Sequence, residues 1–161
     1  RVPLSDEEAA KWYLMSAEQG YSEAQAKMGG LYVSGKGVPQ DFREAMRWYR
    51  LEAEGGNVGA QFNVGLLYEF GEGVPQSFEE AAKWYLMAAE KGNDKAQAYL
   101  ARLYATGQGV PKDLVKAYFW YNIAAVTYAE AREPRNVLSA AMTPQQIAEA
   151  QRLSVEYFEN R

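Results

Sequence analysis

The sequence predicts an all-α fold, a right-handed α-solenoid built from one helix–turn–helix repeat of 36 residues. The four tryptophans follow one another at intervals of 36 residues, and each precedes a tyrosine. A fixed period of roughly 20–50 residues is the signature of a solenoid or a related array, and such arrays usually act as binding surfaces. The tryptophans are Trp12, Trp48, Trp84 and Trp120, and the same interval separates Pro3, Pro39, Pro75 and Pro111, and Ala17, Ala53, Ala89 and Ala125.

The period divides one continuous domain, residues 1–161, into four repeats and a terminal helix. One helical pair cannot bury its own apolar faces, so neighbouring repeats must cover them. The Trp-Tyr stripe is therefore interpreted as core rather than as a ligand cage. We place the repeats at about 2–36, 37–72, 73–108 and 109–141, and a capping helix at about 143–160.

Each repeat opens with a long helix. Ser5 and Asp41 each precede a glutamate by three residues, which is the spacing of a capping box. Apolar residues then recur at every third or fourth position, which indicates one buried helix face. A glycine follows each of the first three long helices, as left-handed caps require. These glycines are Gly20, Gly56 and Gly92.

A shorter helix follows in each of the first three repeats. Ser22 with Gln25 and Asp94 with Gln97 have capping-box spacing. Paired glycines and a Val-Pro dipeptide separate each short helix from the next repeat, and a small residue at one equivalent position predicts close helix packing. The predicted helices are Ala24–Tyr32, Ala60–Tyr68 and Ala96–Tyr104, and the small residues are Gly29, Gly65 and Ala101.

The repeat register ends after Tyr128. A proline is tolerated in a first helical turn, so Pro134 predicts a helix from near Ala131 to about Ala141. A threonine cap followed by proline then begins a final helix with one apolar face, as a terminal cap of a solenoid requires. The cap comprises Thr143, Pro144 and Gln146, the apolar face Ile147, Ala150, Leu153, Tyr157 and Phe158, and the polar face Gln145, Glu149 and Arg152.

The composition argues against several functions. The chain has no cysteine and no histidine, which removes thiolate nucleophiles, Ser-His-Asp catalysis and the usual transition-metal ligands. A net charge of −4 disfavours nucleic-acid binding, which needs a positive patch. The apolar runs fall far below the roughly 18–20 residues that span a bilayer. We therefore predict no enzyme activity, metal, cofactor, nucleic-acid partner or membrane insertion.

The repeats resemble the Sel1-like repeats, a branch of the tetratricopeptide superfamily, over about residues 2–127. The resemblance rests on A-x-x-x-L-G-x-x-Y-x-x-G followed by G-V-x-x-D-x-x-x-A-x-x-W-Y-x-x-A-A-x-x-G, with Ser77 where the pattern has aspartate. The tail M-T-P-x-Q-I-A-x-A-Q is similar to one common in bacterial members, which indicates a bacterial source. Matching positions are Ala60, Val64, Gly65, Tyr68, Gly71, Gly73, Val74, Ala81, Trp84, Tyr85, Ala88, Ala89 and Gly92.

The resemblance implies that the shorter helices line a concave face that binds a protein or peptide partner. Large apolar, aromatic and arginine side chains on such a face are typical interface anchors. Phe62, Leu66 and Phe70 could equally pack against an adjacent repeat. The predicted partner-binding residues are Lys27, Phe62, Asn63, Leu66, Glu69, Phe70, Tyr99, Arg102 and Thr106.

The resemblance also limits the functional alternatives. The leading interpretation is a non-catalytic scaffold for protein interactions, an adaptor or regulatory protein in bacteria. A toxin-immunity role is a more specific form of this interpretation, which the sequence neither favours nor excludes. The alternatives are an enzyme related to β-lactams or the cell wall, and a glycan-binding protein. The sequence leaves the compartment open, with the periplasm or envelope favoured over the cytoplasm.

The first long helix lacks a short partner helix before it. One apolar face near Trp12 is therefore expected to stand open. We predict further repeats or a capping segment upstream in the parent protein, or self-association through this helix.

Overall fold

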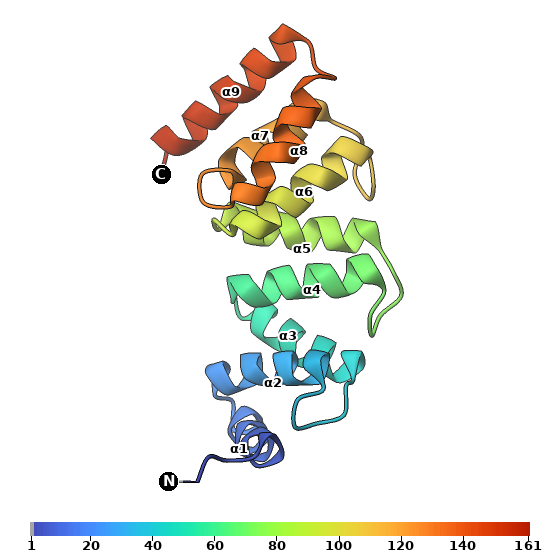
Figure 1. Cartoon of the computed structure of the whole chain (residues 1–161), viewed down its shortest axis with the longest axis vertical. Helices are drawn as coiled ribbons and strands as arrows, with labels where there is room; N and C mark the ends of the chain where they lie inside the picture. The colour runs from blue at the N-terminus through green and yellow to red at the C-terminus, as the bar shows by residue number, and fades with distance from the viewer. Residues whose placement is uncertain (1) are drawn as a thin grey trace. The chain divides into compact units, whose positions relative to one another are not determined.

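The computed structural model describes residues 2–161, and all regular structure in this range is helical (Figure 1). The chain divides into two compact halves, an N-terminal half that ends at Ser77 and a C-terminal half, Phe78–Arg161. The N-terminal half contains α1 (Asp6–Glu18), α2 (Ser22–Ser34), α3 (Phe42–Glu54) and α4 (Val58–Phe70). The C-terminal half contains α5 (Phe78–Glu90), α6 (Asp94–Thr106), α7 (Leu114–Ala124), the 3₁₀ turn η1 (Ala129–Ala131), α8 (Arg132–Ser139) and α9 (Pro144–Glu159).

In the N-terminal half each helix packs on its neighbour in sequence, α1 on α2, α2 on α3 and α3 on α4. Trp48 of α3 is 3% exposed and lies in an apolar cluster with Ala24 and Met28 of α2 and Ala17 of α1. Trp12, at the same position of the first repeat, is 63% exposed. The stripe is therefore core at Trp48, which α2 covers. At Trp12 it is exposed, so the predicted open face is present.

In the C-terminal half α5 packs on α6, α6 on α7, and both α8 and α9 pack on α7. Tyr118 of α7 forms a buried cluster with Met142 and with Ala150 of α9, bordered by half-buried aliphatic side chains. The final helix thus covers the last long helix, as a cap should. Phe158, predicted on the apolar face of α9, is 47% exposed.

The helix ends match the predicted caps at several positions. Ser5 with Glu8 and Thr143 with Gln146 form reciprocal capping boxes at α1 and α9. Asp41 caps α3 by accepting hydrogen bonds from two backbone N–H groups. The glycines after α1, α3 and α5 all have φ between 90° and 97°, the left-handed conformation that glycine adopts without strain.

The predicted capping boxes of the short helices are wrong. Tyr21 stands at the N-cap of α2 and makes no side-chain cap bond, and Asn93, not Asp94, caps α6. The glutamines instead reach back to the preceding long helix. The Nε2 atoms of Gln25, Gln61 and Gln97 donate to the carbonyl oxygens of Ala17, Ala53 and Ala89 at 3.1, 3.2 and 3.1 Å.

The helices α1 to α6 have 13 residues each, so the predicted difference between long and short helices is wrong. The loops after α2, α4 and α6 fold back onto the starts of α1, α3 and α5. Gly37, Gly73 and Gly109 have φ between 70° and 77°. A Cβ atom on any of them would collide with backbone atoms, those of Asp6, Phe42 and Phe78 respectively. The second glycine of each pair is therefore required both by its backbone conformation and by a close backbone approach.

Candidate functional site

The predicted partner-binding residues of the N-terminal half lie on two helices. Lys27 is an exposed residue of α2, and the others belong to α4. Phe62, Leu66 and Phe70 are spaced by four residues and so share one stripe of α4. Phe62, Asn63 and Leu66 are half-buried, Glu69 is 3% exposed and Phe70 is 60% exposed. Phe70 therefore presents the largest accessible apolar group of this face.

The predicted residues of the C-terminal half all lie on α6. The half-buried ring of Tyr99 meets the ring of Tyr85 edge-on, with centroids 5.6 Å apart. The guanidinium carbon of Arg102 lies 5.3 Å from the centroid of the Tyr99 ring. Thr106 is in the last turn, where its hydroxyl donates to the carbonyl oxygen of Arg102 at 2.9 Å. Tyr99 and Arg102 thus form one preorganised aromatic–cation pair.

The Tyr99–Arg102 pair borders a small cavity of about 130 Å³, which we call the α6 cavity. Its other wall comes from α7 and from the segment that follows it, with Tyr121, Tyr128 and Glu130. Sequence reasoning missed these three residues. Tyr121 was interpreted as core from its repeat position. Tyr128 is the last residue of the register, where the first three repeats have the capping glycine, and Glu130 lies beyond it, so neither follows the repeat pattern.

The protonation of the two tyrosines Tyr121 and Tyr128 at the α6 cavity follows from burial and nearby charge. Burial raises the pKa of Tyr121 above its usual value, and the guanidinium of Arg102 opposes this rise. The pKa of Tyr128 is raised by burial and then by the charge of Glu130. Both phenols stay protonated at neutral pH and can donate hydrogen bonds to a partner. The cavity therefore offers aromatic surface, hydroxyl donors and charges of both signs.

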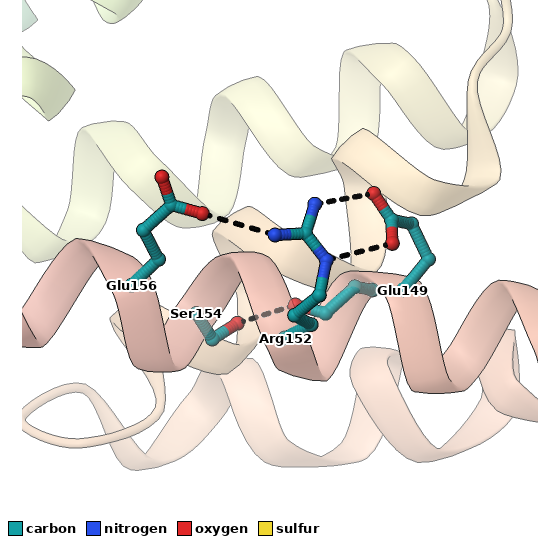
Figure 2. A network of polar contacts seen from close by, with 5 residues as sticks. Glu149, Arg152, Ser154 and Glu156 are labelled. Carbon is teal, nitrogen blue, oxygen red and sulfur yellow. Dashed lines mark hydrogen bonds and ion pairs between the residues drawn. The ribbon is translucent and has the colours of Figure 1, made fainter.

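The exposed side of α9 carries a separate polar network (Figure 2). Arg152 donates to Glu149 at 2.8 and 3.0 Å and to Glu156 at 3.1 Å, which lowers the pKa of the Glu149 carboxyl. Ion pairs at similar spacing join Glu44 to Arg47 and Glu80 to Lys83. Exposed pairs of this kind contribute little stability and mainly solubilise a surface.

Two absences bear on the kind of site. Across residues 2–161, no group of three or more acidic side chains is placed so that it could hold a metal ion. In the same range, every helix is too short or too polar to cross a membrane.

The repeat pattern, the helical pairs and the exposed short-helix faces define a helical-repeat protein of the α-solenoid class. The chain belongs to the Sel1 repeat family. The family model, described as Sel1 repeat, matches residues 2–21, 22–57, 58–93 and 94–125. Proteins built from these repeats are generally scaffolds for protein interactions.

Two solved structures resemble this chain. One is a protective antigen present in uropathogenic Escherichia coli strains and described as displaying an SLR fold, with 36% identity and a TM-score of 0.87. The other is a Sel1 repeat protein from Oxalobacter formigenes, with 43% identity and a TM-score of 0.70. The matches cover 95% and 74% of this chain, but 33% and 49% of those proteins. A search of curated proteins found no match.

Proposed function

We propose that the chain is a non-catalytic scaffold that binds a protein or peptide partner on the exposed faces of α2, α4 and α6. The observation that supports this best is the Tyr99–Arg102 pair beside the α6 cavity. Tyrosine and arginine are enriched among the residues that dominate binding energy, especially beside pockets that a partner can fill.

The rigidity of this pair favours binding. Tyr99 contacts Tyr85 of the neighbouring helix edge-on, and Arg102 lies over its ring. Side chains that are already ordered lose less conformational entropy when a partner arrives. In the N-terminal half, Phe70 and the half-buried residues of α4 supply a second face of the same kind. A bacterial adaptor or regulatory protein, including one that neutralises a toxin, would use such faces.

A double substitution on α6 tests this proposal. The Tyr99→Ala/Arg102→Glu variant is expected to weaken binding of the partner by about 2–4 kcal/mol, because it removes an aromatic anchor and reverses a charge. Partners captured by the wild-type chain from a lysate of the source organism are identified by mass spectrometry. Their purified forms are then titrated by isothermal calorimetry against the wild type and the variant.

The matched control is Tyr21→Ala/Arg43→Glu, which makes the same two changes at exposed residues outside α6. Far-UV circular dichroism of both variants must match the wild type before binding is compared. If the control loses as much affinity as the α6 variant, or the α6 variant binds like the wild type, the site does not lie on α6.

Self-association through α1 stays a prediction with a direct test. Trp12 and Met15 of α1 and Leu4 before it are exposed apolar side chains. Sedimentation equilibrium of the wild type over a range of concentrations is expected to show a dimer that the Trp12→Glu variant dissociates. A wild-type chain that remains monomeric throughout would contradict the prediction.

A further inference from the structure

The C-terminal half contains an open cavity of about 580 Å³ between α5, α6, α7 and α9, which we call the α9 cavity. Its lining includes Tyr104, Lys116, Phe119, Trp120, Tyr157 and Asn160. A volume of this size falls in the range of roughly 300–1,000 Å³ that holds a drug-sized ligand. It differs from the α6 cavity in position and in every lining residue named above.

Three aromatic rings form the apolar wall of the α9 cavity. The centroid of the Phe119 ring is 4.9 Å from that of Trp120 and 5.9 Å from that of Tyr157, both with edge-to-face geometry. Trp120 is 8% exposed, and the other two rings are half-buried. Edge-to-face aromatic clusters are favourable and can accept a further ring in the same geometry.

Comparison of the repeats shows that two residues of this cavity depart from the pattern. The position of Lys116 is occupied by glutamate in the first three repeats, at Glu8, Glu44 and Glu80. The position of Phe119 is occupied in those repeats by a basic residue, at Lys11, Arg47 and Lys83. In the second and third repeats the two side chains form exposed ion pairs of 2.8 and 2.7 Å.

The fourth repeat therefore replaces a surface ion pair with a cation and an aromatic ring. Coverage by α9 explains the apolar Phe119, because that helix packs on α7. It does not require a lysine at residue 116, where an uncharged side chain would serve equally well. The reversed charge at the edge of an aromatic cavity is the feature that indicates a ligand.

The charge of Lys116 is available to a ligand. Within residues 2–161 its ammonium group makes no ion pair, and it lies 5.4 Å from the centroid of the Tyr104 ring. The acidic residue on the cavity lining, Glu156, is hydrogen-bonded to Arg152 at 3.1 Å. The other cation on the lining, Arg161, lies over the Tyr157 ring, with its guanidinium carbon 4.2 Å from the centroid. An exposed cation beside aromatic rings, in a protein of net charge −4, complements a group that combines a ring with a carboxylate.

We propose that the α9 cavity binds the C-terminal aromatic residue of a polypeptide. The ring packs against the wall formed by Phe119, Trp120 and Tyr157, and the terminal carboxylate lies at Lys116. The exposed amide of Asn160 at the same cavity can both donate to and accept from a peptide group, which a free aromatic acid lacks. This inference goes beyond the partner site on α6, because the two cavities share no lining residue.

Nuclear magnetic resonance of the ¹⁵N-labelled chain tests the proposal with acetyl-Ala-Phe as the probe. The indole N–H signal of Trp120, assigned with the Trp120→Phe variant, is expected to shift on titration, while that of the exposed Trp12 serves as an internal reference. The amide acetyl-Ala-Phe-NH₂ is expected to bind about tenfold more weakly, because it lacks the charge that Lys116 recognises.

Two lysine variants separate recognition from structure. Lys116→Gln is expected to lower the affinity for acetyl-Ala-Phe about tenfold and to leave that for the amide unchanged. Lys112→Gln, at an exposed lysine in the loop before α7, is the matched control and should bind both probes like the wild type. Lys116→Glu/Phe119→Lys gives the fourth repeat the ion pair of the third and should bind neither probe. Its far-UV circular dichroism must match that of the wild type before the result is interpreted.

Three outcomes would overturn the proposal. The first is no shift of the Trp120 signal at about 10 mM probe, well above the concentration for a binding free energy of −4.1 kcal/mol. The second is that the Lys116→Gln variant binds acetyl-Ala-Phe as tightly as the wild type does. The third is that 3-phenylpropionate binds as tightly as acetyl-Ala-Phe, which would assign the cavity to free aromatic acids instead.

Discussion

Replacement of Trp48 by alanine is expected to lower the free energy of unfolding by about 3–5 kcal/mol. The indole is 3% exposed and fills the space between α3 and the apolar residues Ala24 and Met28 of α2. Trp12→Ala makes the same chemical change at the same position of the first repeat, where the side chain is 63% exposed. At protein concentrations at which the chain is monomeric, its effect is expected to stay within about 0.5 kcal/mol, as for most surface substitutions.

Thermal unfolding followed by circular dichroism at 222 nm measures both variants. For a chain of this size each kcal/mol shifts Tm by about 2–4 °C, so the two variants should differ clearly. Trp48→Phe separates the packing of the ring from its polar atom, because the Nε1 atom of Trp48 is buried without a hydrogen-bond partner among residues 2–161 and its loss removes that penalty. Equal losses from Trp12→Ala and Trp48→Ala would show that the face near Trp12 is covered in solution.

Replacement of Gly73 by alanine is expected to cost about 3 kcal/mol or more in the free energy of unfolding. The new Cβ atom would lie 2.5 Å from the carbonyl carbon of Phe42 and 2.8 Å from the backbone nitrogen of Arg43. Neither atom can move without shifting the start of α3. The positive φ of 74° adds the strain that any non-glycine residue has in the left-handed region.

Gly71→Ala is the matched control in the same loop. Its φ of 67° is similar, but the atoms nearest to a new Cβ, the Cβ, backbone nitrogen and Cα of Gln76, lie at 3.1, 3.3 and 3.4 Å, a milder approach than at Gly73. We therefore expect about 1–2 kcal/mol from the backbone conformation alone. Urea unfolding measures the difference between the two variants, and equal losses would show that the backbone approach at Gly73 contributes nothing.

The periodic part of the fold was predictable, because the repeat supplies the same observation four times. The pattern around Trp48 placed its helix, its cap at Asp41 and its buried face, and all three are present. The roles of Gln25 and Gln97 were not predictable from spacing. A glutamine three residues after a capping residue fits a capping box, but its longer reach lets it donate to the carbonyl of the preceding helix instead.

The candidate sites were predictable only in part. The resemblance placed Tyr99 and Arg102 together on α6, and in the structure the Arg102 guanidinium lies over the Tyr99 ring, while their part in binding stays a prediction. It carried no information on Tyr128, which replaces the capping glycine at the end of the register, or on Glu130, which follows it. The exchange at Lys116 was visible in the aligned repeats. Its meaning depends on where α9 lies, and a helix outside the repeat has no register from which its packing can be derived.

The backward contact of each loop glycine has a consequence for the growth of such a chain. Gly37, Gly73 and Gly109 each close onto the start of the first helix of the helical pair that they follow, at a constant distance along the sequence. Every closure is therefore complete once a short stretch of chain is present, whatever follows. Short sequence separation between contacting residues favours rapid folding. It also lets duplication or deletion of a whole 36-residue segment lengthen or shorten the protein while each remaining closure keeps its own partners.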